Sequence, residues 1–236
     1  MKLPLKSFLT LGGTLLVILL VVPNAFGQNP NPRVTVSVGG SYLKADRTFV
    51  ADGDPFRSEF VDGGKVRLRG TLDLTKHWSI EGDYSFGRNN QRITELSGGR
   101  LERRDFGVRL SQVHFNLLRF FTSRKSRVRP FMTSGIGAVR FSPTEEAKAR
   151  ALTDKFIDDP ALIGSTTKIN FAIGGGLEAR FNRWVGVRFD LKDYISTVPR
   201  FGLRETPSGP QAAFFPVDGV VHNVEAAVGI VFYFVR

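Results

Sequence analysis

The residues of this chain that could carry out chemistry are few, and most stand apart. It contains three histidines, His77, His114 and His222, and no cysteine. His77 and Ser79 are two residues apart, so on a strand they would share one face, as a base and a nucleophile must. No HExxH pattern or other dense cluster of histidines and carboxylates is present. The sequence therefore predicts no metal site and no cofactor.

Two glycine clusters are a second candidate for chemistry. Gly135 and Gly137 flank Ile136, and Gly174 to Gly176 are consecutive. A glycine loop that binds phosphate has to lead into a helix N-terminus, whereas both clusters lie inside predicted strands. We therefore interpret these glycines as positions that relieve crowding in a curved sheet.

The elements that would position any site are strands. In residues 184–195, apolar Val187 and Phe189 alternate with charged side chains at Arg188, Asp190 and Lys192. This period of two is typical of a strand with two different faces. Eight segments, each of about 9 to 14 residues, are predicted as strands. They cover residues 33–44, 65–75, 78–86, 105–118, 128–141, 167–181, 184–195 and 222–234.

Two of these segments are irregular. In residues 105–118 the apolar residues change phase: Phe106 and Val108 share one phase, whereas Val113 and Phe115 share the other. A β-bulge near Ser111-Gln112 would reconcile the two halves. In residues 128–141 the many glycines leave the two faces unassigned.

The first 27 residues have the form of a secretory signal peptide. Lys2 and Lys6 precede an apolar run, which is followed by Pro23 and the small-residue pattern Ala25-Phe26-Gly27. We predict cleavage after Gly27, with a retained membrane anchor as the alternative. The remaining domain, 28–236, has no cysteine for a lipid anchor or a disulfide and no apolar run long enough for a transmembrane helix.

The charge of the chain is strongly basic. The formal net charge is +11 and the sequence pI is about 10.3. Because an exported protein rarely meets nucleic acid, we expect no nucleic-acid partner and instead attraction to anionic lipid head groups.

The links between the predicted strands alternate in length. Residues 76–77 and 182–183 are tight turns and residues 119–127 form a moderate link, whereas the links after the first, third, fifth and seventh strands are long. All long links then lie at one end of an antiparallel meander, as in outer-membrane barrels. Phe49 to Gly64 and Phe201 to Gly219 are candidate recognition loops, for a ligand that the sequence does not name. Solvated spacers are the alternative for both loops.

The third long link, residues 142–156, has helical features. Ser142 and Glu145 have capping-box spacing, and Pro143 would occupy the first helical position. A disordered charged loop is the alternative.

Alternation fits both a membrane barrel and a soluble lipocalin-like barrel with an apolar interior. The unequal links favour the membrane barrel, and so do aromatic residues near strand ends, which resemble an interfacial girdle. These residues are Tyr42, Trp78, Phe121, Phe181 and Trp184. The chain also has 21 Phe, more than the interior of a small barrel could hold.

Three stretches resemble the OmpA/OmpX-type outer-membrane β-barrel domain family, in its short form without a periplasmic domain. They are "VRPFMTSGIGAVRF", "NFAIGGGLEARFNRWVGVRFDLKDY" and the terminal "EAAVGIVFYFVR". The resemblance spans residues 33–234 and implies an all-β fold, an eight-stranded antiparallel up-and-down barrel in the bacterial outer membrane. It also implies that Gly229, Phe232 and Phe234 form the signal read by the barrel-insertion machinery, although Ala227 and the terminal Val235-Arg236 depart from the usual pattern.

An eight-stranded barrel leaves a lumen that side chains can fill, and here the inward face would be charged. The predicted lumen residues are Lys65, Arg67, Arg69, Asp73, Glu81, Asp83, Lys168, Glu178, Arg180, Arg188, Asp190, Lys192 and Glu225. Both signs are present, so we expect paired charges, a plugged lumen and no access for a sugar substrate.

The leading functional hypothesis is a non-enzymatic, monomeric outer-membrane protein that contacts lipids and acts through its long external loops. The alternatives are a narrow gated pore, a lipid-modifying barrel enzyme and a soluble periplasmic binder. His77 and Ser79 match the His-x-Ser spacing of lipid A deacylase barrels. They lie beside a periplasmic turn, however, so an interfacial histidine is the favoured interpretation.

Overall fold

The structure, a computed structural model, describes residues 33–46, 49–50, 56–97, 100–153, 164–199, 201 and 220–234. The predicted signal peptide and most of the candidate loop from Phe201 to Gly219 lie outside these residues. The elements are β1 (Arg33–Asp46), β2 (Phe49–Val50), β3 (Phe56–Asp73), β4 (Trp78–Ser97), β5 (Arg100–Phe120), β6 (Val128–Pro143), α2 (Glu145–Thr153), β7 (Thr166–Arg180), β8 (Val185–Thr197) and β9 (Val220–Phe234).

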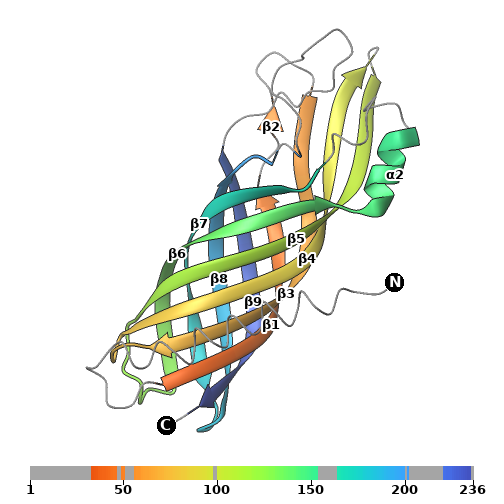
Figure 1. The fold of residues 1–236 in the computed structure, drawn as a ribbon. Helices are drawn as coiled ribbons and strands as arrows, with labels where there is room; N and C mark the ends of the chain where they lie inside the picture. Colours follow the sequence, from red (N-terminus) through yellow and green to blue (C-terminus); the bar gives the residue numbers. More distant parts are fainter. Residues whose placement is uncertain are drawn as a thin grey trace.

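Eight long strands close into a barrel (Figure 1). Consecutive strands from β3 to β9 pair antiparallel, and β1 pairs with both β9 and β3, so the ring has no free edge. Val34, for example, is opposite Phe234 on one side and Leu72 on the other. The two-residue strand β2 pairs only with β3 and lies outside the ring. The predicted eight-stranded up-and-down barrel is confirmed.

The apolar side chains face outward and the charged ones face inward. On β8, Phe189 and Leu191 are 51% and 58% exposed, whereas Arg188 and Lys192 are at most 1% exposed. In a soluble barrel the apolar side chains would face inward and the charged ones outward, because burial of apolar surface away from water is favourable. The lipocalin-like alternative is therefore wrong, and hydrocarbon is the solvent that suits the outer surface.

The two ends of the barrel differ. Residues 74–77, 121–127 and 181–184 form the links at one end, which also holds the start of β1 and the end of β9. Trp78, Phe121, Phe181 and Trp184 are exposed there, as an interfacial girdle requires. Tyr42 is also exposed, but it lies further along β1 towards the opposite end. Since outer-membrane barrels have short periplasmic turns, we call the end with these links the periplasmic end.

At the opposite, outer end the strands continue where loops were predicted. β4 and β5 pair without interruption as far as Ser97 and Arg100, and they rise above the barrel as a hairpin (Figure 1). Residues 56–61, part of a predicted recognition loop, pair with residues 90–95. Outside lipid neither face has to be apolar, so the alternation that identifies a strand in the sequence disappears while backbone pairing persists.

The predicted bulge near Ser111-Gln112 is wrong. Gln112 is opposite Ser85 and Val139 in unbroken ladders, and the register shift lies between Val61 and Gly64 instead. The apolar phase changes because the outer part of the lumen is itself apolar. Its buried cluster consists of Val108, Leu110, Val139, Phe141 and Phe201. The same cluster assigns the faces of β6, whose odd-numbered residues point inward.

The helix predicted after β6 is present, but its cap is different. α2 begins at Glu145, and the Thr144 hydroxyl accepts a hydrogen bond from the Ala147 N–H at 3.2 Å. Ser142 and Pro143 belong to β6, where Pro143 is opposite Val108. Pairing with β5 thus holds Ser142 in the sheet and moves the N-cap to Thr144.

Candidate functional site

The lumen of the barrel is filled by three layers of buried charged side chains. The central layer is built around Glu81, which is 2% exposed. Its carboxylate accepts hydrogen bonds from Arg188 Nη1 at 2.5 Å and from Lys192 Nζ at 3.2 Å. Asn116 Nδ2 at 3.1 Å and Thr71 Oγ1 at 3.2 Å complete its surroundings. Four donors from three different strands, β3, β5 and β8, thus converge on one carboxylate.

Two further carboxylates extend the central layer. Asp190 accepts from Arg188 Nη2 at 2.8 Å and from Arg69 Nη1 at 2.6 Å. Asp83 lies 3.2 Å from Arg67 Nε, 3.6 Å from Arg69 Nε and 3.6 Å from Lys192 Nζ.

The outer layer is built around Glu225, which is fully buried. Lys65 Nζ donates to it at 2.8 Å and Arg67 Nη2 lies 2.5 Å away. Arg67 also donates to the Tyr194 hydroxyl at 2.6 Å, and Lys65 donates to Gln112 at 3.0 Å. Arg67 therefore connects this layer to Asp83 in the layer below.

The periplasmic layer combines two carboxylates with aromatic rings. Asp73 lies 3.7 Å from Arg129 and accepts a hydrogen bond from Ser79 at 2.6 Å. Glu178 lies 3.5 Å from Arg129 and 3.6 Å from Arg33. The Arg129 guanidinium also stacks over the Phe120 ring, 3.7 Å from its centre. Cations, carboxylates and aromatic rings are thus packed together at this end of the lumen.

The charges of the lumen are nearly balanced, which makes their burial tolerable. Among the described residues, seven buried basic side chains face six buried acidic ones. The basic set is Arg33, Lys65, Arg67, Arg69, Arg129, Arg188 and Lys192, and the acidic set is Asp73, Glu81, Asp83, Glu178, Asp190 and Glu225. Removing one partner of such a pair leaves a buried charge without compensation.

Glycines at inward positions give the long side chains room. A Cβ added at Gly174 would contact Lys192, and one added at Gly176 would lie 2.7 Å from the Phe131 ring. A Cβ at Gly137 would lie 2.6 Å from the His114 ring. A side chain at these three positions would crowd the lumen residues, as the crowding interpretation predicted, and the glycine clusters lie within strands β6 and β7.

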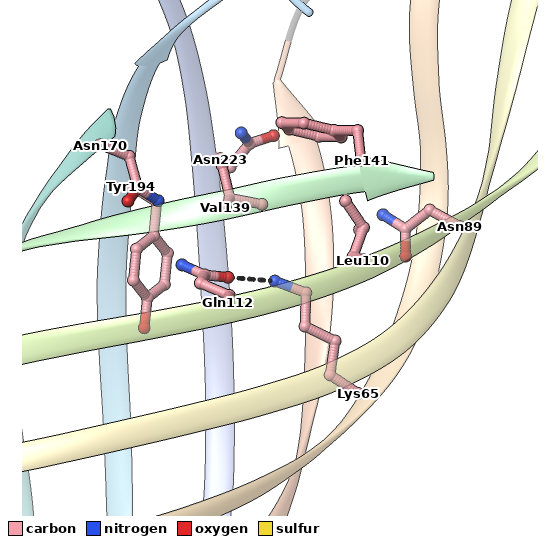
Figure 2. Close-up of a pocket in the computed structure, with 9 residues that line it drawn as sticks. All are labelled: Lys65, Asn89, Leu110, Gln112, Val139, Phe141, Asn170, Tyr194 and Asn223. Carbon is pink, nitrogen blue, oxygen red and sulfur yellow. Dashed lines mark hydrogen bonds between the residues drawn. The ribbon is translucent and has the colours of Figure 1, made fainter. Parts of the chain in front are cut away.

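A small pocket lies above the outer layer (Figure 2). Its empty volume is about 320 Å³, which includes open solvent. It is lined by Lys65, Asn89, Leu110, Gln112, Val139, Phe141, Asn170, Tyr194 and Asn223. Asn89 and Asn170 are buried, and amide atoms of both have no protein hydrogen-bond partner. Ordered water beside these amide groups could satisfy them.

Eleven of the thirteen predicted lumen residues lie buried in these layers. Lys168, near the outer end of β7, is only half buried. Arg180 is also only half buried, at the periplasmic end, where its guanidinium donates to the carbonyl of Lys125 at 3.0 Å. Both share the inward phase of their strand, but they lie beyond the part of the barrel that encloses a side chain on all sides.

Several lumen residues were not predicted. Arg129 lies on the strand whose faces the sequence left unassigned, and His114 lies on the strand with the wrongly predicted bulge. Arg33 and Tyr233 are in phase with Thr35 and Glu225, so the period of two places both on the inward face, although the predicted set of lumen residues did not include them.

His77 and Ser79 make separate contacts. Ser79 donates to the buried Asp73, whereas the His77 ring lies 3.1 Å from the Phe120 carbonyl in the turn region. Within the described part of the chain, no three His, Cys, Asp or Glu side chains could hold a metal ion together. Phe232 and Phe234 of the predicted assembly signal are exposed on the outer surface of β9 near the periplasmic end.

A closed barrel with an apolar outer surface and a charged lumen is the architecture of an integral membrane β-barrel protein. A family model described as "Outer membrane protein beta-barrel domain" matches residues 12–197, and the chain belongs to that family. It is thus a bacterial outer-membrane protein, as the resemblance to OmpA/OmpX-type barrels implied. No helix among the described residues is both long and apolar enough to span a bilayer.

Several solved structures are similar to this chain. The outer membrane protein OprG of Pseudomonas aeruginosa is 12% identical over 86% of this chain and 95% of its own, with a TM-score of 0.59. Neisserial surface protein A is 11% identical over 86% and 97%, with a TM-score of 0.49. The N-terminal barrel of P. aeruginosa OprF is 13% identical over 85% and 97%, with a TM-score of 0.42. The likeness to OprG shows the fold alone, and no curated protein sequence matches the chain.

Proposed function

We propose that this protein is a closed, non-conducting and non-enzymatic outer-membrane barrel that acts as a monomer through the structure at its outer end. One observation carries the first part of this proposal: Arg188, buried in the lumen, is paired with both Glu81 and Asp190. The lumen charges are engaged with one another, so a passing ion would have to separate pairs that have little water to replace them.

The outer end supports the second part of the proposal. Here β4 and β5 continue above the barrel and β3 pairs with β4 up to Phe56, so a hydrogen-bonded sheet, and not only a loop, extends from the membrane. Recognition usually resides on segments held by a rigid scaffold. The loop from Phe201 to Gly219 stays a candidate recognition segment outside the described residues.

Conductance in planar bilayers tests the plug. We expect near-zero conductance for the native protein and small discrete steps for Arg188→Ala, because the substitution removes a large buried side chain that joins Glu81 to Asp190 across the lumen. The matched control is Arg140→Ala, which removes an exposed, outward-facing arginine of β6 and should not conduct. Steady conductance of the native protein would favour the narrow pore instead. Near-zero conductance of both native protein and Arg188→Ala would exclude a gate at that position.

The hairpin extension allows a second test. Deleting residues 91–106 joins Asn90 directly to Gly107, its partner across the two strands. If the extension serves interaction and not barrel stability, the shortened protein should still insert and still shift on a detergent gel when boiled. Failure to form the heat-modifiable band would show that the extension is required for the barrel itself.

A further inference from the structure

In the part of the chain that the structure describes, the links at the periplasmic end, here called the periplasmic rim, carry only positive charge at their surface. In residues 74–77, 119–128 and 180–185, five basic side chains are exposed and no acidic residue occurs. The five are Lys76, Arg119, Lys125, Arg127 and Arg183. The carboxylates of β3 and β7 nearest this end, Asp73 and Glu178, are buried in the lumen and already paired. The rim charge is therefore open to an anionic partner.

Two arginines of this rim are stacked on tryptophans. The Arg119 guanidinium lies 4.9 Å from the centre of the Trp78 ring, and that of Arg183 lies 5.2 Å from the Trp184 ring. These are the only two tryptophans of the chain. Arg119 is on the lipid-facing side of β5, opposite the exposed Met132 across the ladder. A cation in that position has apolar neighbours and, among the described residues, no carboxylate partner.

The level of these Arg–Trp pairs in the bilayer indicates which ligand they would bind. Tryptophan rings concentrate at the level of the lipid head groups, and arginine stems extend along apolar surface so that the guanidinium reaches the same level. A planar guanidinium offers paired N–H donors that match a phosphate, and stacking on an aromatic ring holds it in place without neutralising it. The short links place this rim in the periplasmic leaflet.

We propose that the pairs Arg119–Trp78 and Arg183–Trp184 are two binding sites for the phosphate of anionic glycerophospholipids in the periplasmic leaflet. The exposed Lys76, Lys125 and Arg127 supply additional positive charge around them. This inference is independent of the plug, because none of these side chains lies in the lumen.

Electron spin resonance measures the lipid preference directly. The purified protein is reconstituted in phosphatidylcholine vesicles with a trace of either spin-labelled phosphatidylglycerol or spin-labelled phosphatidylcholine, and the immobilised fractions are compared. One basic side chain near an anionic surface corresponds to about a fivefold preference at low salt. We expect the native protein to prefer phosphatidylglycerol by a factor of this order, and the preference to fall strongly at about 1 M salt.

Three variants decide the assignment. Arg119→Gln should lower the preference, and Arg119→Gln combined with Arg183→Gln should abolish most of it. Lys148→Gln, in the exposed helix α2 away from the rim, removes the same charge and should leave the preference unchanged. Heat-modifiability on a detergent gel confirms that each variant is folded. Equal immobilisation of both lipids by the native protein, a full preference in the double variant, or an equal loss in Lys148→Gln would overturn the proposal.

Discussion

The lumen and the periplasmic rim use the same residue types in opposite environments. Arg188 in the lumen is fully buried and contacts two carboxylates, whereas Arg119 on the rim is exposed and stacks on a tryptophan. A buried guanidinium has lost its water and depends on its carboxylates, so the network tolerates little change. An exposed one keeps its water and remains available to a ligand. Burial and not residue type therefore separates a structural arginine from a binding one.

The largest effect is expected from breaking the lumen network at Glu81. Glu81→Ala leaves Arg188 without one of its carboxylates and removes the hydrogen-bonded carboxylate of Lys192. Loss of one partner of a buried pair costs about 3–5 kcal/mol, so the free energy of unfolding should fall by about that amount. Urea unfolding of the reconstituted protein, followed by tryptophan fluorescence, measures the change.

Glu146→Ala is the control for that measurement, because this carboxylate is exposed on α2. Its substitution should change the free energy of unfolding by less than about 0.5 kcal/mol. If both variants unfold at the same urea concentration as the native protein, the lumen charges are not the stabilising feature described above.

An intermediate effect is expected from adding a methyl group where a glycine leaves room for a lumen side chain. Gly176→Ala places a methyl group against the Phe131 ring and the Phe189 carbonyl. Overpacking of this kind costs about 1–3 kcal/mol. Gly64→Ala is the matched control, since a Cβ there has no atom within 4 Å. Gly176→Ala should therefore unfold at a lower urea concentration than Gly64→Ala. Equal unfolding midpoints would mean that the lumen side chains rearrange around the added methyl group at little cost.

The comparison also explains what the sequence could and could not predict. Inside the bilayer every strand has one face in hydrocarbon and one in a narrow lumen, so Arg188, Asp190 and Lys192 were correctly placed from their period of two. Near the outer end of the lumen Leu110 and Phe141 point inward as well, so polarity no longer distinguishes the faces. Above the membrane, residues 91–97 still pair with β5, but their apolar and polar residues no longer alternate. They were therefore predicted as a loop.

Contacts between strands were harder to predict than faces. The pairing of Arg188 with Glu81 joins residues on β8 and β4, which lie on different sides of the barrel. The alternation identifies both as inward, but the choice of partner depends on strand tilt and stagger, which no local pattern encodes. The stacking of Arg119 on Trp78 has the same origin, because the two are opposite each other only through the register of β4 and β5.

The smallest effect is expected on the rim, and it sharpens the contrast with the lumen. Arg119→Ala removes an exposed side chain that stacks on Trp78 and has no carboxylate partner among the described residues. An exposed cation–ring contact is worth about 0.5–1 kcal/mol, so the free energy of unfolding in uncharged detergent should fall by no more than that. In vesicles with anionic lipid the loss should be larger, because the native protein there also gains from the bound head group. Measuring the same variant in both media separates the two contributions. An equally small change in both media would leave Arg119 with a purely structural role. A loss in uncharged detergent as large as that of Glu81→Ala would show that the exposed arginine stabilises the fold as much as the buried lumen charges do.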